Sequence, residues 1–264
     1  MQRSRVGMVV GALAAAAAAL ALGLSGCGAL SGEAGASGGG VDATTGETHP
    51  AVAEATRTDA AAFDPDTVSD GGPLTTDLVD PAWLDQAASA TGIPRRALEG
   101  YAAAALAVAD TDPGCHLGWN TLAAIGWVES HHGTIFGGEI GPDGRTTDLI
   151  YGVQLNGGGF QEIPDTDGGA VDGDTEWDRA VGPMQIVPAT WAAWAAEANG
   201  DGPPDIHSID DASLTAADYL CYSGGDLSTE TGWRDAITSY NESPAYLDEV
   251  LDYAIRYAGA ADGS

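Results

Sequence analysis

The sequence predicts an all-α fold, and three observations lead to this prediction. Seven segments after residue 80 carry helix start and stop signals. No stretch of five or more residues alternates between polar and apolar side chains, apart from a weak pattern around residues 150–155, so we expect only minor β content. The hydrophobic content of 44%, with seven Trp and eight Tyr, is sufficient for a core and excludes a wholly disordered chain.

The expected helices span residues 81–90, 94–110, 119–132, 188–198, 211–223 and 231–240, and a last one opens at Ser243-Pro244. Asp80 and Pro81 suit the cap and first turn of the first helix. Gly or Asn-Gly follows four of these segments and marks their ends. The last helix carries an apolar stripe from Leu247 to Tyr257, which predicts a face packed on the core.

One long segment, residues 134–181, separates the third and fourth helices. It is rich in Gly and Asp and has no helical period. A loop of this length inside a compact domain is usually functional or disordered. Because it contains Tyr151, Phe160 and Trp177, we expect an ordered surface that forms part of a cleft.

The charge balance limits the partners. The chain has 39 acidic residues against nine basic ones, all Arg, for a formal net charge of −30. Such a surface repels phosphate backbones and anionic headgroups, so we expect no nucleic-acid binding and no electrostatic membrane binding. We expect a monomer.

The first residues predict export. Arg3 and Arg5 precede an uncharged apolar run over residues 6–24, which is typical of a signal peptide. The run ends in Leu24-Ser25-Gly26-Cys27, which resembles a bacterial lipobox, in which the Cys is lipidated and becomes the mature N-terminus. We therefore expect residues 1–26 to be a lipoprotein signal peptide and Cys27 to anchor the exported protein on the membrane, facing the cell wall. The alternative is an uncleaved transmembrane helix.

Residues 27–75 are rich in Gly, Ala, Ser and Thr and show no period, so we expect a flexible tether there and the catalytic domain over residues 76–260. The two remaining cysteines, Cys115 and Cys221, predict a disulfide in an exported chain. Two free buried thiols are the alternative.

Glu129 lies on the apolar side of the third expected helix. Trp119, Leu122, Gly126 and Glu129 recur at helical spacing. Both burial and a helix C-terminus disfavour the charged carboxylate and raise its pKa, which is what a general acid needs. A boundary Glu, paired with Arg or exposed, is the alternative interpretation.

Four motifs then occur together. They are Leu-Ala-Ala-Ile-Gly-Trp-Val-Glu-Ser at 122–130, Gly-Pro-Met-Gln-Ile-Val-Pro at 182–188, Ala-Ala-Asp-Tyr-Leu at 216–220 and Ser-Tyr-Asn at 239–241. Their order and spacing resemble those of lytic murein transglycosylases of the membrane-bound B type, over about residues 81–258. The resemblance implies a lysozyme-like helical catalytic domain that acts on peptidoglycan.

The resemblance also implies roles for individual residues. Glu129 would protonate the oxygen that bridges MurNAc and GlcNAc, and would then accept the proton of the muramic C6 hydroxyl, which gives a 1,6-anhydromuramic product without a cofactor. Gln185 would contact sugar, and Tyr240 or Asn241 would position the substrate. Met184, Asp178 and Ser130 are further candidates for substrate binding.

One part of the sequence departs from this family pattern. Glu129 is followed by Ser130-His131-His132-Gly133, whereas the family usually has Thr or Ser and then a small residue. Adjacent helical side chains point about 100° apart, so the His pair does not form a joint metal site. We interpret both as polar residues of the last helical turn.

Two acidic loops are candidate cation sites. Glu197, Asn199 and Asp201 stand at positions 1, 3 and 5 of an EF-hand-like opening with Gly at position 6. The Pro203 carbonyl and Asp211 would complete a structural calcium site; a solvated turn is the alternative. Residues 165–169 and 172–174 could bind a cation, accept hydrogen bonds from sugar hydroxyls or form a solvated rim.

Two other functions remain open at this point. A lysozyme-like hydrolase would use Asp174 or Asp178 to activate water, since ordinary glycosidases need two carboxylates. A non-catalytic glycan-binding or scaffold lipoprotein would present aromatic platforms instead. The candidate platforms are Trp127, Trp177, Trp191 and Trp194.

Overall fold

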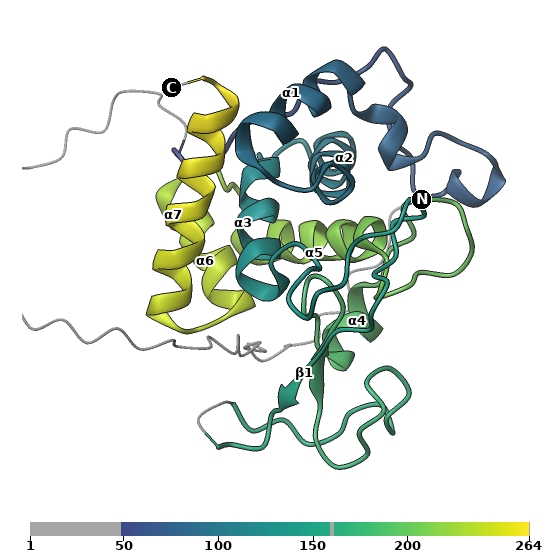
Figure 1. Ribbon diagram of the computed structural model, residues 1–264, viewed down its shortest axis with the longest axis vertical. Helices are drawn as coiled ribbons and strands as arrows, with labels where there is room; N and C mark the ends of the chain where they lie inside the picture. Colours follow the sequence, from purple (N-terminus) through teal and green to yellow (C-terminus); the bar gives the residue numbers. More distant parts are fainter. Residues whose placement is uncertain (1–48, 159–160, 264) are drawn as a thin grey trace, which may run out of the picture.

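The computed structural model describes residues 49–158 and 161–263, and these form a mostly helical body (Figure 1). Its seven α-helices are α1 Pro81–Thr91, α2 Arg95–Thr111, α3 Trp119–Ser130, α4 Pro188–Trp194, α5 Ile209–Gly224, α6 Glu230–Tyr240 and α7 Pro244–Ala261. The predicted helical class is thereby confirmed for this part of the chain. The predicted signal peptide, Cys27 and the first part of the predicted tether lie outside the described residues.

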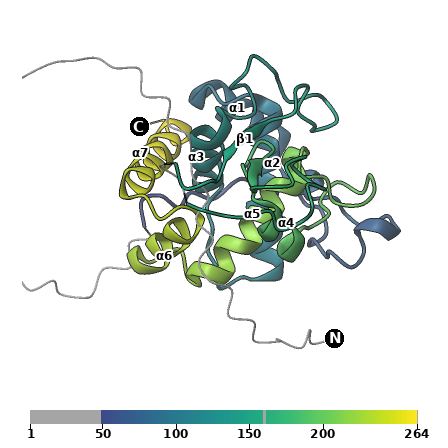
Figure 2. The same cartoon turned by 90° about the horizontal axis from the view of Figure 1, so that it is seen from below.

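The core is built around α3. This helix packs against α2 and α7, while α5 packs against α2 and α6; Figures 1 and 2 show α3 enclosed among these neighbours. Trp119, Leu122 and Ile125 are fully buried, and so are the small polar residues between them. A helix that is apolar all round belongs in the middle of a domain, so α3 is a central helix rather than a one-sided one.

Residues 49–75 differ from the prediction. We expected them to continue the flexible tether, but they pack against the domain and include the short 3-10 helix η1 Val68–Asp70. Ala51, Phe63 and Val68 are buried in the main core, and a second 3-10 helix, η2 Thr75–Leu78, follows. The folded domain therefore includes residues 49–75. Their isolated apolar side chains carry no local signal and are buried through tertiary contacts.

Three helix boundaries also differ, each for a local reason. The third helix ends at Ser130 because His131 adopts a left-handed conformation (φ 50°). The fourth stops at Trp194, since the backbone of 196–198 turns away to bond to side chains of α5: Ala196 N donates to Thr215 and Ala198 N to Asp211. The fifth begins earlier than expected, at Ile209, because Ser208 caps it by accepting from the Asp211 N–H.

The long segment between α3 and α4 is ordered where it is described. It contains an antiparallel pair, β1 Tyr151–Gln154 and β2 Arg179–Val181, with Tyr151 opposite Val181. Isolated bridges continue the pairing outward, as between Pro164 and Trp177. In Figure 1 this segment projects below the helices, next to α4. The expected minor β content and structured surface are confirmed.

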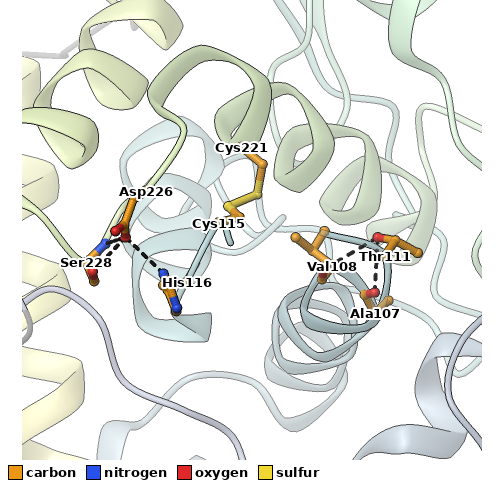
Figure 3. The surroundings of a disulfide bond; sticks show 8 residues. All are labelled: Ala107, Val108, Thr111, Cys115, His116, Cys221, Asp226 and Ser228. Atoms are coloured by element: carbon orange, nitrogen blue, oxygen red, sulfur yellow. Dashed lines mark hydrogen bonds and ion pairs between the residues drawn. A yellow bond between two sulfur atoms is a disulfide. The ribbon is translucent and has the colours of Figure 1, made fainter. Parts of the chain in front are cut away.

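The predicted disulfide joins Cys115, in the α2–α3 connection, to Cys221 on α5, with 5.3 Å between the Cα atoms. Figure 3 shows Asp226 beside it, contacted by the His116 ring (2.9 Å) and by the Ser228 hydroxyl, which donates to it (2.6 Å). Closing a loop of this length stabilises a fold by about 4–5 kcal/mol on the chain-entropy account. Within residues 49–158 and 161–263, no helix is long and apolar enough to span a bilayer.

Candidate active site

The carboxyl of Glu129 lies at the end of the central helix and is almost enclosed. Its residue is 6% exposed. The Tyr246 hydroxyl, from the first turn of α7, donates to Glu129 Oε1 at 2.6 Å. No arginine or histidine pairs with it among the described residues. The alternative of an Arg-paired or exposed boundary residue does not fit this environment.

Burial governs the protonation of Glu129. Removal of the carboxylate from water raises the pKa of Glu129 to about 8, while the hydrogen bond from Tyr246 lowers it. The group therefore carries its proton at neutral pH. A carboxylic acid that is protonated at pH 7 and loses its proton near pH 8 can serve as a general acid and then as a base.

A tight turn brings the second motif against α3. Val181 and Ile186 form a two-way backbone bridge around Gly182-Pro183-Met184-Gln185. Gly182 has φ 78°, and a Cβ there would lie 2.1 Å from the carbonyl oxygen of Ile206, so only glycine fits. The Ser130 hydroxyl donates to the Pro183 carbonyl (2.6 Å) and fixes the turn to the end of α3.

The fourth motif, Ser-Tyr-Asn at 239–241, also supports this turn. Tyr240, the last residue of α6, is buried and donates its hydroxyl to the Met184 carbonyl at 2.7 Å. Burial and the nearby charge of Glu129 raise the pKa of Tyr240 well above its usual range. Tyr240 therefore lies close to Glu129 and remains a phenol, although no hydrogen bond joins the two.

Two polar side chains of the site keep unused hydrogen-bonding atoms. Gln185, in a left-handed conformation (φ 48°), donates to the Gly182 carbonyl, and its Oε1 has no partner among the described residues. Asn241 accepts from the Ser243 N–H, and its amide N–H groups are free in the same part of the chain. These atoms are available to a ligand.

A pocket opens beside the second motif. Gln185 and Tyr240 line it, together with residues just before α4, on α4 and on α5. These other lining residues are Ile186, Val187, Thr190, Thr215, Ala216 and Tyr219. Glu129 is not part of the lining.

The aspartates of the long loop are held by the loop itself. Asp174 accepts from Gln154 Nε2 (2.6 Å) and Arg179 Nε (2.9 Å), and these and backbone donors hold its pKa well below its usual range. Asp178 is fully buried and accepts from the N–H and hydroxyl of Thr166. Burial raises the pKa of Asp178. No Asp178 contact reaches Glu129, so its side chain orders the loop rather than the substrate cleft.

The 197–211 loop gathers three carboxylates. One oxygen each of Glu197, Asp201 and Asp211 lies within 4.8 Å of the others. Glu197 Oε2 is buried without a hydrogen-bond partner. Burial raises the pKa of Asp211 to about 7, against the lowering by backbone donors. Asn199 Oδ1 accepts from the Asp201 N–H, and Pro203 lies exposed in the same loop.

The second acidic loop also brings three carboxylates together, those of Asp165, Asp167 and Asp178. Here the oxygens already accept hydrogen bonds from the loop backbone. Asp165 accepts from the N–H groups of residues 167–169, and Asp167 from those of residues 169–171. This cluster is satisfied without a cation.

The structure thus brings Glu129, Ser130, Met184, Gln185, Tyr240 and Asn241 to one place. Within this group, Ser130 and Met184 are fully enclosed and hold the turn, which leaves Gln185 and Asn241 to meet a ligand. Tyr246 is the residue that sequence reasoning missed. Its contact with Glu129 joins residues 117 positions apart, and the only local signal was its place in the first turn of the last helix.

Comparison with known proteins found no relative. No protein-family model, no curated protein and no solved structure matches this chain.

Proposed function

We propose that this protein is an exported, lipid-anchored lytic transglycosylase that cleaves the MurNAc–GlcNAc β-1,4 bond of peptidoglycan. The observation that carries the proposal is the state of Glu129, a buried carboxyl with one phenol partner and a pKa near 8. A lysozyme-like arrangement of the helices is part of the same proposal, on the resemblance of the four motifs.

The reaction needs one carboxyl used twice. Glu129 donates its proton to the bridging oxygen as the C1–O bond breaks, and the GlcNAc hydroxyl leaves. The muramic C6 hydroxyl then attacks C1 and passes its proton to the Glu129 carboxylate, which restores the acid. After Glu129 has given up its proton, the hydrogen bond from the Tyr246 hydroxyl stabilises the negative charge of the carboxylate.

The neighbouring pocket suits the sugar's acetamido group. Aliphatic and aromatic side chains line most of it, and Thr190 contributes a hydroxyl that has no partner among the described residues. An acetamido group has a methyl for the apolar wall and an amide for the polar atoms. Gln185 Oε1 and the Asn241 amide would bind hydroxyl or amide groups of the same sugar.

The two aspartates that a hydrolase would use to activate water already bind other groups of the loop. Asp174 is ion-paired to Arg179 and Asp178 is enclosed with Thr166. Neither is free to activate water, which favours the intramolecular C6 hydroxyl as the nucleophile.

The proposal is tested by incubating residues 28–264 with purified peptidoglycan and following the release of soluble fragments. Release by the wild-type protein, with none by Glu129→Gln, supports an enzyme that acts through this carboxyl. Glycan binding without release from either protein would support the non-catalytic scaffold function instead.

We further propose that the 197–211 loop holds a structural calcium ion between Glu197, Asp201 and Asp211. The buried, unpartnered Glu197 Oε2 and the adjoining Asp211 carboxyl fit an oxygen-seeking divalent cation. Arg145, which pairs with Asp201 and Asp205, would have to share Asp201 with the ion. The Asn199 side chain and the Pro203 carbonyl remain candidates for further oxygen ligands.

Calcium should raise the melting temperature of the wild-type protein and not that of Asp211→Asn. Asp201→Asn is a second variant, at an exposed ligand whose loss leaves the core intact. Absence of calorimetric heat and of any thermal shift with calcium would refute the ion site.

A further inference from the structure

The end of α3 has an unusual backbone directly after Glu129 and Ser130. His131, His132 and Gly133 all have positive φ, at 50°, 59° and 82°. Left-handed backbone at a residue other than Gly costs on the order of 1 kcal/mol, so two such histidines in succession need compensation from their surroundings. The compensation at His131 is slight, since this side chain is exposed and stacks on Trp127.

His132 is held much more firmly. Its residue is 3% exposed, and both ring nitrogens have partners: Nδ1 lies 3.2 Å from the Tyr101 hydroxyl and Nε2 lies 3.1 Å from the Tyr257 hydroxyl. Burial lowers the pKa of His132 to about 3, so the ring is neutral. One nitrogen then accepts from a phenol, and the other donates its N–H to the second phenol.

The three residues connect the helices that surround the candidate acid. Tyr101 belongs to α2 and Tyr257 to α7, while His132 follows α3. The hydroxyl of Tyr101 also lies directly on α3, because a Cβ at Gly126 would be 2.0 Å from it. Gly126 therefore makes room for the Tyr101 side chain.

The same α7 supplies Tyr246, the hydrogen-bond donor to Glu129. The end of α3 and the body of α7 must keep a fixed separation for this 2.6 Å bond to form. His132, three residues after Glu129, and Tyr257, eleven residues after Tyr246, set that separation at a second point.

We propose that His132 is a positioning residue, and that the Tyr101–His132–Tyr257 clamp holds the end of α3 against α2 and α7 so that Glu129 stays enclosed and paired with Tyr246. The clamp explains why a histidine occupies a left-handed position that Gly or Asn would fill more easily. The structural role of the clamp does not depend on the proposed function, and only its expected effect on catalysis rests on that proposal.

Tyr257→Phe tests the clamp with the least disturbance, because it removes one hydroxyl and leaves His132 Nε2 without a partner. Tyr253→Phe is the matched control: it makes the same change one turn earlier on α7, where the ring packs on Trp127 and on the Tyr257 ring. The Tyr253 hydroxyl makes no hydrogen bond among the described residues, so its loss leaves the contacts of His132 in place. His132→Asn is a second variant, since Asn tolerates the left-handed backbone but cannot span the two tyrosines.

Two readouts separate positioning from stability. The first is the titration of the Glu129 carboxyl by ¹³C NMR, which needs no activity; the second is kcat and KM on glycan strands. We expect Tyr257→Phe and His132→Asn to admit water to Glu129, move its pKa down toward the ordinary range and lower kcat about tenfold with KM little changed. Tyr253→Phe should resemble the wild-type protein in both.

A melting temperature that falls in Tyr257→Phe while kcat and the Glu129 titration stay at wild-type values would overturn the proposal. An inactive wild-type protein whose Glu129 titration still shifts in Tyr257→Phe would support the clamp and refute the proposed reaction. The two failures are therefore distinguishable.

Discussion

Glu129, near the end of α3, and Asp174, in the loop between β1 and β2, are both carboxyls, yet their surroundings give them opposite states. Glu129 is enclosed by apolar helices with a single phenol, and its pKa lies near 8. Asp174 is surrounded by an arginine, an amide and backbone N–H groups that hold its pKa far below the usual range. The comparison teaches that burial with a single donor raises the pKa of a carboxyl, whereas several donors keep a carboxyl ionised. The first kind can exchange a proton near neutral pH, and the second kind holds the fold.

The largest expected effect comes from removing the acid. Glu129→Gln keeps the shape and the hydrogen bond from Tyr246 but has no proton to give, so turnover should fall by about a thousandfold or more. Rates of fragment release, measured beside glycan binding and circular dichroism, check this. Wild-type rates in the folded variant would remove Glu129 from the mechanism.

Loss of the disulfide should affect stability and not chemistry. The disulfide joins the connection that precedes α3 to α5, whereas Glu129 lies near the opposite end of α3. Cys115→Ser with Cys221→Ser should lower the melting temperature by on the order of 10 °C. An unchanged melting curve would show that helix packing alone fixes this junction.

The pH dependence of Glu129 has a definite sign. The folded-state pKa is raised above that of the unfolded chain, so the acid form in the folded protein is favoured below about pH 8 and is lost above it. We expect kcat/KM to decline as pH rises through about 8. The same shift makes the folded state lose stability as pH rises from about 4.5 to about 8. In this range Glu129 is ionised in the unfolded chain but still protonated in the folded protein.

Glu129→Gln should therefore melt at a higher temperature than the wild-type protein at pH 8, with the difference vanishing near pH 4. Parallel thermal melts of the two proteins at both pH values check this. A difference that does not depend on pH would mean that Glu129 titrates normally.

The smallest effect is expected at the contrasting carboxyl. Asp174→Asn removes the ion pair with Arg179 but no reacting group, so activity should stay within about threefold of wild type. Kinetics on glycan strands measure this. A loss comparable to that of Glu129→Gln would mean that Asp174 activates water, and would restore the hydrolase alternative.

Much of the fold could be predicted because its signals are local. Asp80 caps α1 as expected, with its side chain accepting from the Trp83 N–H, and Gly92 ends the helix in a left-handed conformation. Helical spacing placed Glu129 on the apolar side of its helix but left open an exposed or Arg-paired position, which the structure excludes. Residues 49–75 could not be predicted, since the burial of Phe63 and Val68 depends on distant helices.

The candidate site could be predicted only where its residues lie in recognisable local motifs. The four motifs give Glu129, Gln185, Tyr240 and Asn241, and the structure gathers them. The hydrogen bond from Tyr246 and the clamp at His132 depend on how α7 lies across α3, which no pattern within either segment reveals.

The central claim is that this protein cleaves glycan strands with the muramic C6 hydroxyl as the nucleophile. The most direct test is the mass of the muramic ends on the fragments that it releases. Residues 28–264 and the Glu129→Gln variant would be incubated with purified peptidoglycan, and the soluble fragments analysed by mass spectrometry. The account predicts muropeptides one water lighter than reducing ones, absent with Glu129→Gln. Reducing ends from the wild-type protein would contradict it, because they require water, and not the muramic C6 hydroxyl, as the nucleophile.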